Sequence, residues 1–152
     1  MRTVTSSIDL DAPPQRVWDV LMDTPEYASW NPFITRLQGD LEVGSKLGAR
    51  IAPPGSKPRT FAPTVTEVDS ARRLAWLGRF VVPGVFDGAH SFTLEPLPNG
   101  RTRLVQSERF TGVLVWFAGK LLRNTAAGFD AMNAALQQRL AQGAGRNGRQ
   151  HP

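Results

Sequence analysis

The sequence HSFTLEPLPNGRTRLVQSERF, from His90 to Phe110, predicts an antiparallel β-hairpin. Its centre, Pro98–Asn99–Gly100, is a loop of a common hairpin length, with a glycine available for a left-handed backbone position. This loop fixes the register, because Leu97 then faces Arg101. Further from the loop, the directly opposed pairs are Leu94–Leu104, Phe92–Gln106 and His90–Glu108.

The two faces of this hairpin differ in polarity. Residues with odd numbers are mostly polar and suit solvent, whereas residues with even numbers are mostly apolar and suit a buried face. Directly opposed residues lie on the same face, with their Cβ atoms about 4.5–5.5 Å apart. Three polar residues, His90, Gln106 and Glu108, interrupt the apolar face. We therefore expect all three to point toward the interior of the protein.

Alternating polarity and turn residues place further elements on both sides of the hairpin. Residues 3–10 predict a first strand, and the prolines that follow predict two short helices within residues 11–31. Strand-like segments with turn residues between them then recur at 33–40, 45–52, 59–69, 72–80, 86–97 and 101–111.

Apolar side chains spaced by three or four residues predict one long C-terminal helix, from about Val113 to Gln142. Its buried stripe would consist of Leu114, Phe117, Leu121, Thr125, Phe129, Met132, Leu136 and Leu140. Asn133 falls outside this stripe. The helix and the hairpins each have one apolar surface to bury, which predicts an α+β fold in which a curved antiparallel sheet of about seven strands wraps around the helix.

Several motifs resemble the SRPBCC superfamily, whose helix-grip fold is shared by START domains and birch-pollen-type allergens. The resemblance is carried by IDLDAPPQRVWDVLMDTPEYASWNPFI (8–34), LAWLGRF (74–80), FDGAHSFTLEP (86–96) and GRTRLVQSERFTG (100–112). The chain is most similar to bacterial polyketide cyclase/dehydratase-like members. Residues 1–142 are therefore expected to form a single domain, followed by a disordered basic tail at residues 143–152.

The resemblance implies a deep, largely apolar cavity between the concave sheet and the long helix. The expected function is binding of a hydrophobic or amphipathic small molecule, as a carrier, sensor or sequestering protein. The alternative is an enzyme of cyclase or dehydratase type that uses His90 as its acid/base and Glu108 to orient it. The register and the resemblance together predict a set of ligand-binding residues: Trp76, His90, Phe92, Leu94, Gln106, Glu108, Phe110, Phe117 and Leu121.

Within that cavity, His90 is expected near the mouth, and three interpretations of His90 and Glu108 are open. Hydrogen bonds to each other or to the backbone would only satisfy two buried polar groups. With Gln106 they would orient the polar end of an apolar ligand, as a few placed polar groups do in mostly apolar pockets. A histidine oriented by a carboxylate also suits general-base catalysis.

Composition excludes several other chemistries. No residue is cysteine, so disulfides and thiol catalysis are ruled out, and His90 is the only histidine before the tail, which excludes a histidine-rich metal site. No metal-ligand cluster or phosphate loop is visible, and we expect no cofactor. Three arginines after residue 138 account for more than half of the formal charge of +5, and the nearly neutral remainder does not favour nucleic-acid binding.

The apolar runs of the chain do not favour the membrane. The longest, VLVWFAG from Val113, is too short for a membrane span, and the N-terminal residues lack the apolar segment of a secretory signal. We therefore expect a cytoplasmic protein, either a monomer or a homodimer. The loops at 52–58 and 81–86 and the turn at 111–114 are expected to form the rim of the cavity, with VVPGVF (81–86) serving as a lid or a dimer contact.

Overall fold

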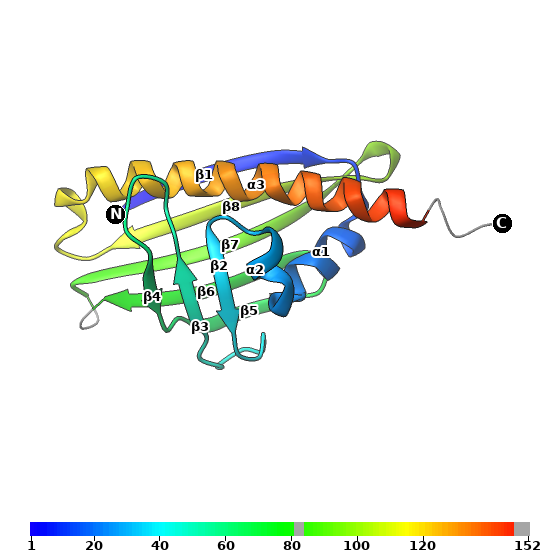
Figure 1. The fold of residues 1–152 in the computed structure, drawn as a ribbon. Helices are drawn as coiled ribbons and strands as arrows, with labels where there is room; N and C mark the ends of the chain where they lie inside the picture. Colours follow the sequence, from blue (N-terminus) through cyan, green and yellow to red (C-terminus); the bar gives the residue numbers. More distant parts are fainter. Residues whose placement is uncertain (81–83, 148–152) are drawn as a thin grey trace.

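Five antiparallel strands form the main sheet of the protein (Figure 1). The computed structural model describes residues 1–80 and 84–147. Hydrogen-bonded neighbours follow the order β1-β8-β7-β6-β5. In that order the strands are β1 (Arg2–Leu10), β8 (Arg101–Thr111), β7 (Phe86–Leu97), β6 (Arg73–Phe80) and β5 (Thr64–Asp69).

A second sheet contains β2 (Ile34–Gln38), β3 (Gly48–Ile51) and β4 (Arg59–Phe61). The sequence predicted a single sheet, but the structure has two. It also predicted one strand over residues 59–69, which is in fact two strands. Pro63 follows β4 and has no backbone N–H to contribute to a ladder, so the segment divides into β4 and β5, which belong to different sheets. A β-bridge between Lys46, which precedes β3, and Thr64 of β5 links the two sheets.

The hairpin of β7 and β8 has the register that the sequence predicted. His90 lies opposite Glu108, and the pairing continues without a shift as far as Leu97 and Arg101. The connecting turn (η2, Pro98–Gly100) has positive φ angles of 65° at Asn99 and 70° at Gly100. Asparagine and glycine tolerate this left-handed backbone region best, which explains why the turn forms at this point.

Two short helical segments after β1 close one end of the fold. They comprise α1 (Pro14–Met22), then the 3₁₀ turn η1 (Thr24–Glu26) continuing into α2 (Tyr27–Trp30). The side-chain oxygen of Asn31 accepts hydrogen bonds from the backbone N–H groups of Phe33 and Ile34, at 3.0 and 2.9 Å. This side chain ends α2 and directs the chain into β2.

The C-terminal helix α3 (Gly119–Asn147) begins six residues later than predicted and extends further. A turn with φ of +116° at Gly112 and a 3₁₀ turn, η3 (Val115–Phe117), occupy the predicted first turns. Leu114 and Phe117 are therefore exposed rather than part of the buried stripe. Residues 143–147, assigned from sequence to the tail, are helical, and residues 148–152 lie outside the described part.

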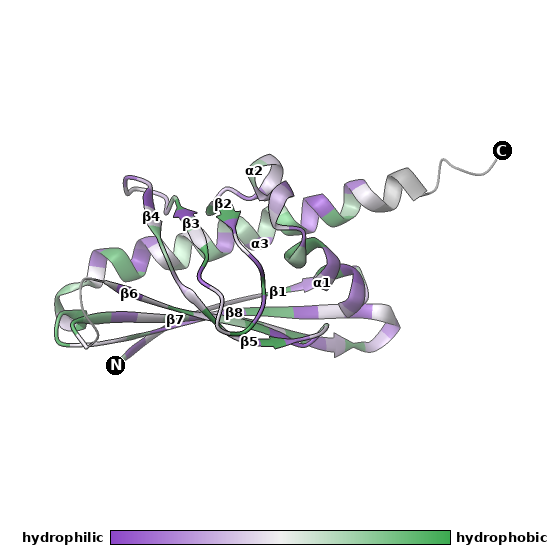
Figure 2. Cartoon of the chain, turned by 90° about the horizontal axis from the view of Figure 1, so that it is seen from below, coloured by the Kyte–Doolittle hydropathy of each residue, from purple (hydrophilic) through white to green (hydrophobic). Residues whose placement is uncertain are grey.

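Helix α3 and the smaller sheet lie on the same side of the five-stranded sheet (Figure 2). The predicted α+β architecture, an antiparallel sheet with a long C-terminal helix, is thus confirmed. The core between these layers is apolar and well closed: Leu10, Leu21, Leu74, Phe92, Leu104, Phe129, Met132 and Leu136 have no exposed surface. None of the helices in the described ranges has both the length and the hydrophobicity needed to cross a bilayer.

Candidate functional site: a cavity between the sheet, the helix and the β3–β4 loop

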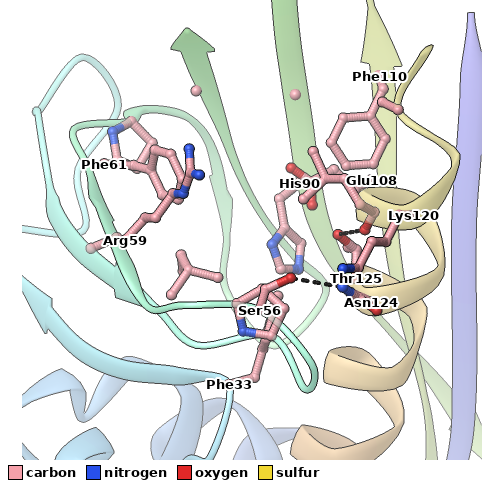
Figure 3. A pocket seen from close by; sticks show the side chains of 18 of the residues that line it. Phe33, Ser56, Arg59, Phe61, His90, Glu108, Phe110, Lys120, Asn124 and Thr125 are labelled. Carbon is pink, nitrogen blue, oxygen red and sulfur yellow. Dashed lines mark hydrogen bonds between the residues drawn. The ribbon is translucent and has the colours of Figure 1, made fainter. Parts of the chain in front are cut away.

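A cavity of about 590 Å³ opens between the five-stranded sheet, the first turns of α3 and the β3–β4 loop. Figure 3 shows its polar side chains: His90 and Glu108 project from the sheet, while Lys120, Asn124 and Thr125 come from the helix. Most of the remaining lining is apolar or aromatic. This size and composition are typical of sites for organic small molecules.

His90 forms part of the inner wall of the cavity. It is 4% exposed, and its ring stacks on Phe92 with a centroid separation of 4.6 Å. Trp76, its neighbour on β6, lies edge-on at 5.2 Å, and Phe129 of α3 lies at 4.9 Å. Burial lowers the pKa of His90 from 6.5 to about 4, against the opposing effect of its hydrogen bond to Gln106. The imidazole is therefore neutral at pH 7.

The polar partner of His90 is Gln106. His90 Nε2 lies 3.2 Å from the side-chain oxygen of Gln106, which comes from the adjacent strand β8. One of the open interpretations included a hydrogen bond between His90 and Glu108, and this bond does not form, although the two residues oppose each other in register. Glu108 therefore does not orient the histidine ring.

Glu108 is half-buried and faces the cavity. Its carboxyl group occupies space that Gly88 leaves open, since a Cβ atom at residue 88 would come within 2.6 Å of Glu108 Oε1. Burial raises the pKa of Glu108 from 4.5 to about 7. Near neutral pH the cavity thus contains a carboxyl group that is able to donate or to accept a proton.

The mouth of the cavity is formed by exposed residues. Phe117 is 86% exposed, and Lys57, Arg59 and Lys120 surround the opening with positive charge. His90 lies at the inner wall instead, because Trp76, Phe92 and Phe129 enclose it, so its predicted position near the mouth is wrong.

The predicted rim loops lie as follows. Asn124 Nδ2 donates a 2.7 Å hydrogen bond to Ser56 Oγ and so joins the 52–58 loop to α3. The turn at 111–114 contacts the backbone of the 84–85 segment: Val113 and Leu114 donate to the carbonyls of Gly84 and Val85. Residues 81–83, which carry most of the predicted lid, lie outside the described residues.

The structure brings six of the nine predicted ligand-binding residues to the cavity surface: Trp76, His90, Glu108, Phe110, Phe117 and Leu121. Phe92, Leu94 and Gln106 do not line it. Phe33 and Phe129, whose rings meet edge-on at 5.6 Å, fill the space between the sheet and the helix, and Phe33 and His90 both line the cavity. Phe92 and Leu94 belong to the core.

Sequence reasoning placed the 52–58 loop at the rim of the cavity but missed the contribution of the smaller sheet. Phe33, Ala49 and Ile51 line the cavity opposite His90, together with residues of the 53–59 loop. Two local signals were available: a glycine inside a strand, Gly88, marks a close approach, and Thr125 is a polar residue within an apolar helix stripe. Among the described residues, no group of three or more metal-ligating side chains is placed to hold an ion.

Comparisons with known proteins agree with this architecture. Residues 1–141 match the family described as "Polyketide cyclase / dehydrase and lipid transport", and the chain belongs to this family. Its fold is that of START-like proteins, as the sequence motifs predicted. No protein with a curated description matches the chain.

Three solved structures illustrate the shared fold. The Zhui aromatase/cyclase from Streptomyces sp. R1128 is 20% identical, with a TM-score of 0.71 over 93% of this chain and 94% of that one. A START superfamily protein from Mycobacterium smegmatis is 16% identical, with a TM-score of 0.73 over 92% and 97% of the two chains. Protein MLL2253 from Mesorhizobium loti is 19% identical, with a TM-score of 0.73 over 93% and 98%.

Proposed function

We propose that this protein binds a hydrophobic or amphipathic small molecule in the cavity between α3, β6–β8 and the β3–β4 loop. The observation that carries the proposal is the cavity itself: about 590 Å³, mostly apolar walls, and two polar groups, His90 and Glu108, on the sheet side. Apolar walls supply affinity, and a few polar groups fix the orientation of the ligand. The family description, which includes lipid transport, supports the same function.

The exposed aromatic residue at the mouth also supports ligand binding. Phe117 lines the cavity while leaving most of its side chain in water. A ligand that fills the opening would cover this ring, and burial of apolar area is favourable by roughly 25 cal/mol per Å². The basic side chains of Lys57, Arg59 and Lys120 stand beside it and favour a ligand whose outer end is polar or acidic.

A second candidate function is an enzyme of cyclase or dehydratase type. The observation that favours it is the pKa of Glu108, which burial raises to about 7, beside a neutral His90. A carboxyl group that titrates near pH 7 suits general acid/base catalysis, and the description of the family includes cyclases and dehydrases.

The binding proposal is tested by filling the cavity. Gly78 lines it from β6, and a Cβ atom there would meet only ordinary contacts, with the nearest atom at 3.9 Å. Gly78→Ile is expected to fold and to weaken binding of an aromatic polyketide, a quinone, a sterol or a fatty acid, measured by isothermal titration calorimetry. Gly48→Ile is the matched control, since Gly48 lies on a strand of the smaller sheet, outside the cavity lining.

Two results would count against these functions. If no compound of the four classes binds the wild-type protein, or if Gly78→Ile binds as tightly as Gly48→Ile, the cavity is not the binding site. Turnover of a bound polyketide that is the same in wild-type protein, His90→Ala and Glu108→Gln would exclude the enzymatic candidate.

A further inference from the structure

A chain of side-chain hydrogen bonds leads from the cavity wall through the core to the protein surface. His90 contacts Gln106, whose Nε2 donates to Asn133 Oδ1 at 2.7 Å. Asn133 Nδ2 donates to Ser6 Oγ at 3.1 Å, and the Ser6 hydroxyl donates to Asp130. We call these five residues the polar relay. Its inner members are almost fully buried, since Gln106 is 0% and Asn133 3% exposed.

The surface end of the polar relay fixes the direction of every bond in it. Asp130 is exposed, and a carboxylate only accepts hydrogen bonds. Ser6 must therefore donate to Asp130, which leaves its oxygen to accept from Asn133. Each amide then has its oxygen on the side nearer the cavity, and the last of these, on Gln106, accepts the proton of His90 Nε2.

The consequence for His90 is a single tautomer. A neutral imidazole carries one proton, and here Nε2 holds it, so Nδ1 keeps a free lone pair and only accepts. No hydrogen bond within the described chain involves Nδ1, and His90 lines the cavity. A ligand hydrogen-bond donor is the group that this nitrogen is able to pair with.

We propose that the polar relay holds His90 as a hydrogen-bond acceptor, and that the cavity consequently selects small molecules with a hydroxyl group over their O-methyl analogues. The selection rests on the proposed ligand-binding function, whereas the tautomer is a property of the ligand-free protein. Gln106, Asn133, Ser6 and Asp130 are positioning residues in this scheme, because they act through His90.

The tautomer is tested directly by nitrogen NMR of the ligand-free protein. The chain has two histidines, so His151→Gln leaves His90 as the only imidazole signal. The expected spectrum at pH 7 is that of a neutral ring protonated at Nε2. Asp130→Ala removes the carboxylate that sets the direction of the hydrogen bonds. The side-chain amides of Gln106 and Asn133 are then free to rotate by 180° and exchange the positions of their oxygen and nitrogen atoms. We expect this variant to place a measurable fraction of His90 in the Nδ1-protonated form.

A matched control separates this effect from a general loss of charge. Asp19 is also an exposed aspartate on a helix, its side chain accepts a hydrogen bond from Gln15, and Asp19→Ala should leave the His90 spectrum unchanged. A wild-type ring protonated at Nδ1, or the same tautomer in wild type and Asp130→Ala, would overturn the role of the polar relay.

The selection is tested with 1-naphthol and 1-methoxynaphthalene, in which a methyl group replaces the hydroxyl proton. An unpaired buried acceptor costs about 1–3 kcal/mol, so the wild-type protein should prefer the naphthol by roughly ten- to hundredfold. Asp130→Ala should narrow this preference, and Asp19→Ala should keep it. Equal affinities of the wild-type protein for the two compounds would refute the selection. If neither compound binds, the proposed ligand-binding function is contradicted. The NMR measurement of the His90 tautomer would still test the role of the polar relay.

Discussion

Replacing Glu108 by glutamine should change the stability of the protein at high pH and not at low pH. The folded protein holds a proton on Glu108 up to about pH 7, whereas an unfolded chain loses it near pH 4.5. Between these values the folded state binds the extra proton, so the contribution of Glu108 to the free energy of unfolding falls as the pH rises. Above pH 7 the folded protein carries the full cost of a buried carboxylate.

The magnitude follows from the size of the pKa shift. A rise from 4.5 to about 7 corresponds to about 3 kcal/mol at 1.36 kcal/mol per unit. Glu108 is only half-buried and faces a cavity that water can enter, so the expected effect is about 1–3 kcal/mol. Glutamine has the same shape without the charge. We compare the free energy of unfolding of Glu108→Gln with that of the wild type at each pH. The variant should gain about 1–3 kcal/mol on the wild type between pH 5 and pH 8.

His90 acts in the opposite sense over an overlapping range. Between about pH 4 and 6.5 the unfolded chain binds a proton that the buried ring does not, so this contribution falls as the pH decreases. In the wild type the two effects oppose each other between pH 4.5 and 6.5. Glu108→Gln removes the effect of Glu108 and leaves that of His90. The free energy of unfolding of this variant should therefore rise with pH up to about 6.5.

Urea denaturation followed by circular dichroism at pH 5, 6.5 and 8, at constant ionic strength, measures these free energies. Glu95→Gln is the matched control, because Glu95 is an exposed residue on the same hairpin. If Glu108→Gln changes the free energy of unfolding equally at pH 5 and pH 8, Glu108 does not titrate as a buried group, and the reasoning about the cavity wall fails.

Three further predictions concern side-chain space and the cavity rim. Gly128→Ala should destabilise the protein by about 1–3 kcal/mol in urea denaturation, because its Cβ would come within 2.3 Å of the Phe33 ring; an unchanged midpoint would contradict this packing. Gly88→Ala should keep the fold but displace the flexible carboxyl group of Glu108, so the difference in stability between pH 5 and pH 8 should shrink relative to the wild type. Asn124→Ala removes an exposed hydrogen bond to the β3–β4 loop and should cost less than about 1 kcal/mol of stability while it speeds ligand release in stopped-flow measurements; an unchanged release rate would show that the loop does not retain the ligand.

The local rules of hairpins were sufficient to predict the sheet side of the site. The turn at Asn99–Gly100 fixes the register of β7 and β8, and alternation then assigns His90 and Glu108 to the inner face. The position of the long helix was predictable only in part. Its apolar stripe from Phe129 onward is buried, but the backbone at Gly112 turns the chain before the helix begins, and periodicity does not detect such a turn.

The partners of the polar side chains depend on contacts between distant segments. Gln106 bonds both His90 and Asn133, which are 16 and 27 residues away along the chain. Asn133 falls outside the apolar stripe of α3 and is buried nonetheless, because these bonds satisfy its amide. The separation of the small sheet from the main one, which supplies the other wall of the cavity, likewise depends on how β2–β4 pack over α3.

The most direct test of the central claim is to locate a bound ligand. Titration of the ¹⁵N-labelled protein with 1-naphthol should shift the amide resonances of residues that line the cavity, such as Gly78, Gly88, Glu108 and Thr125, together with the ring signals of His90. Shifts confined to other regions, for example the smaller hollow of about 350 Å³ bordered by α2, β2 and Arg50, would contradict the account.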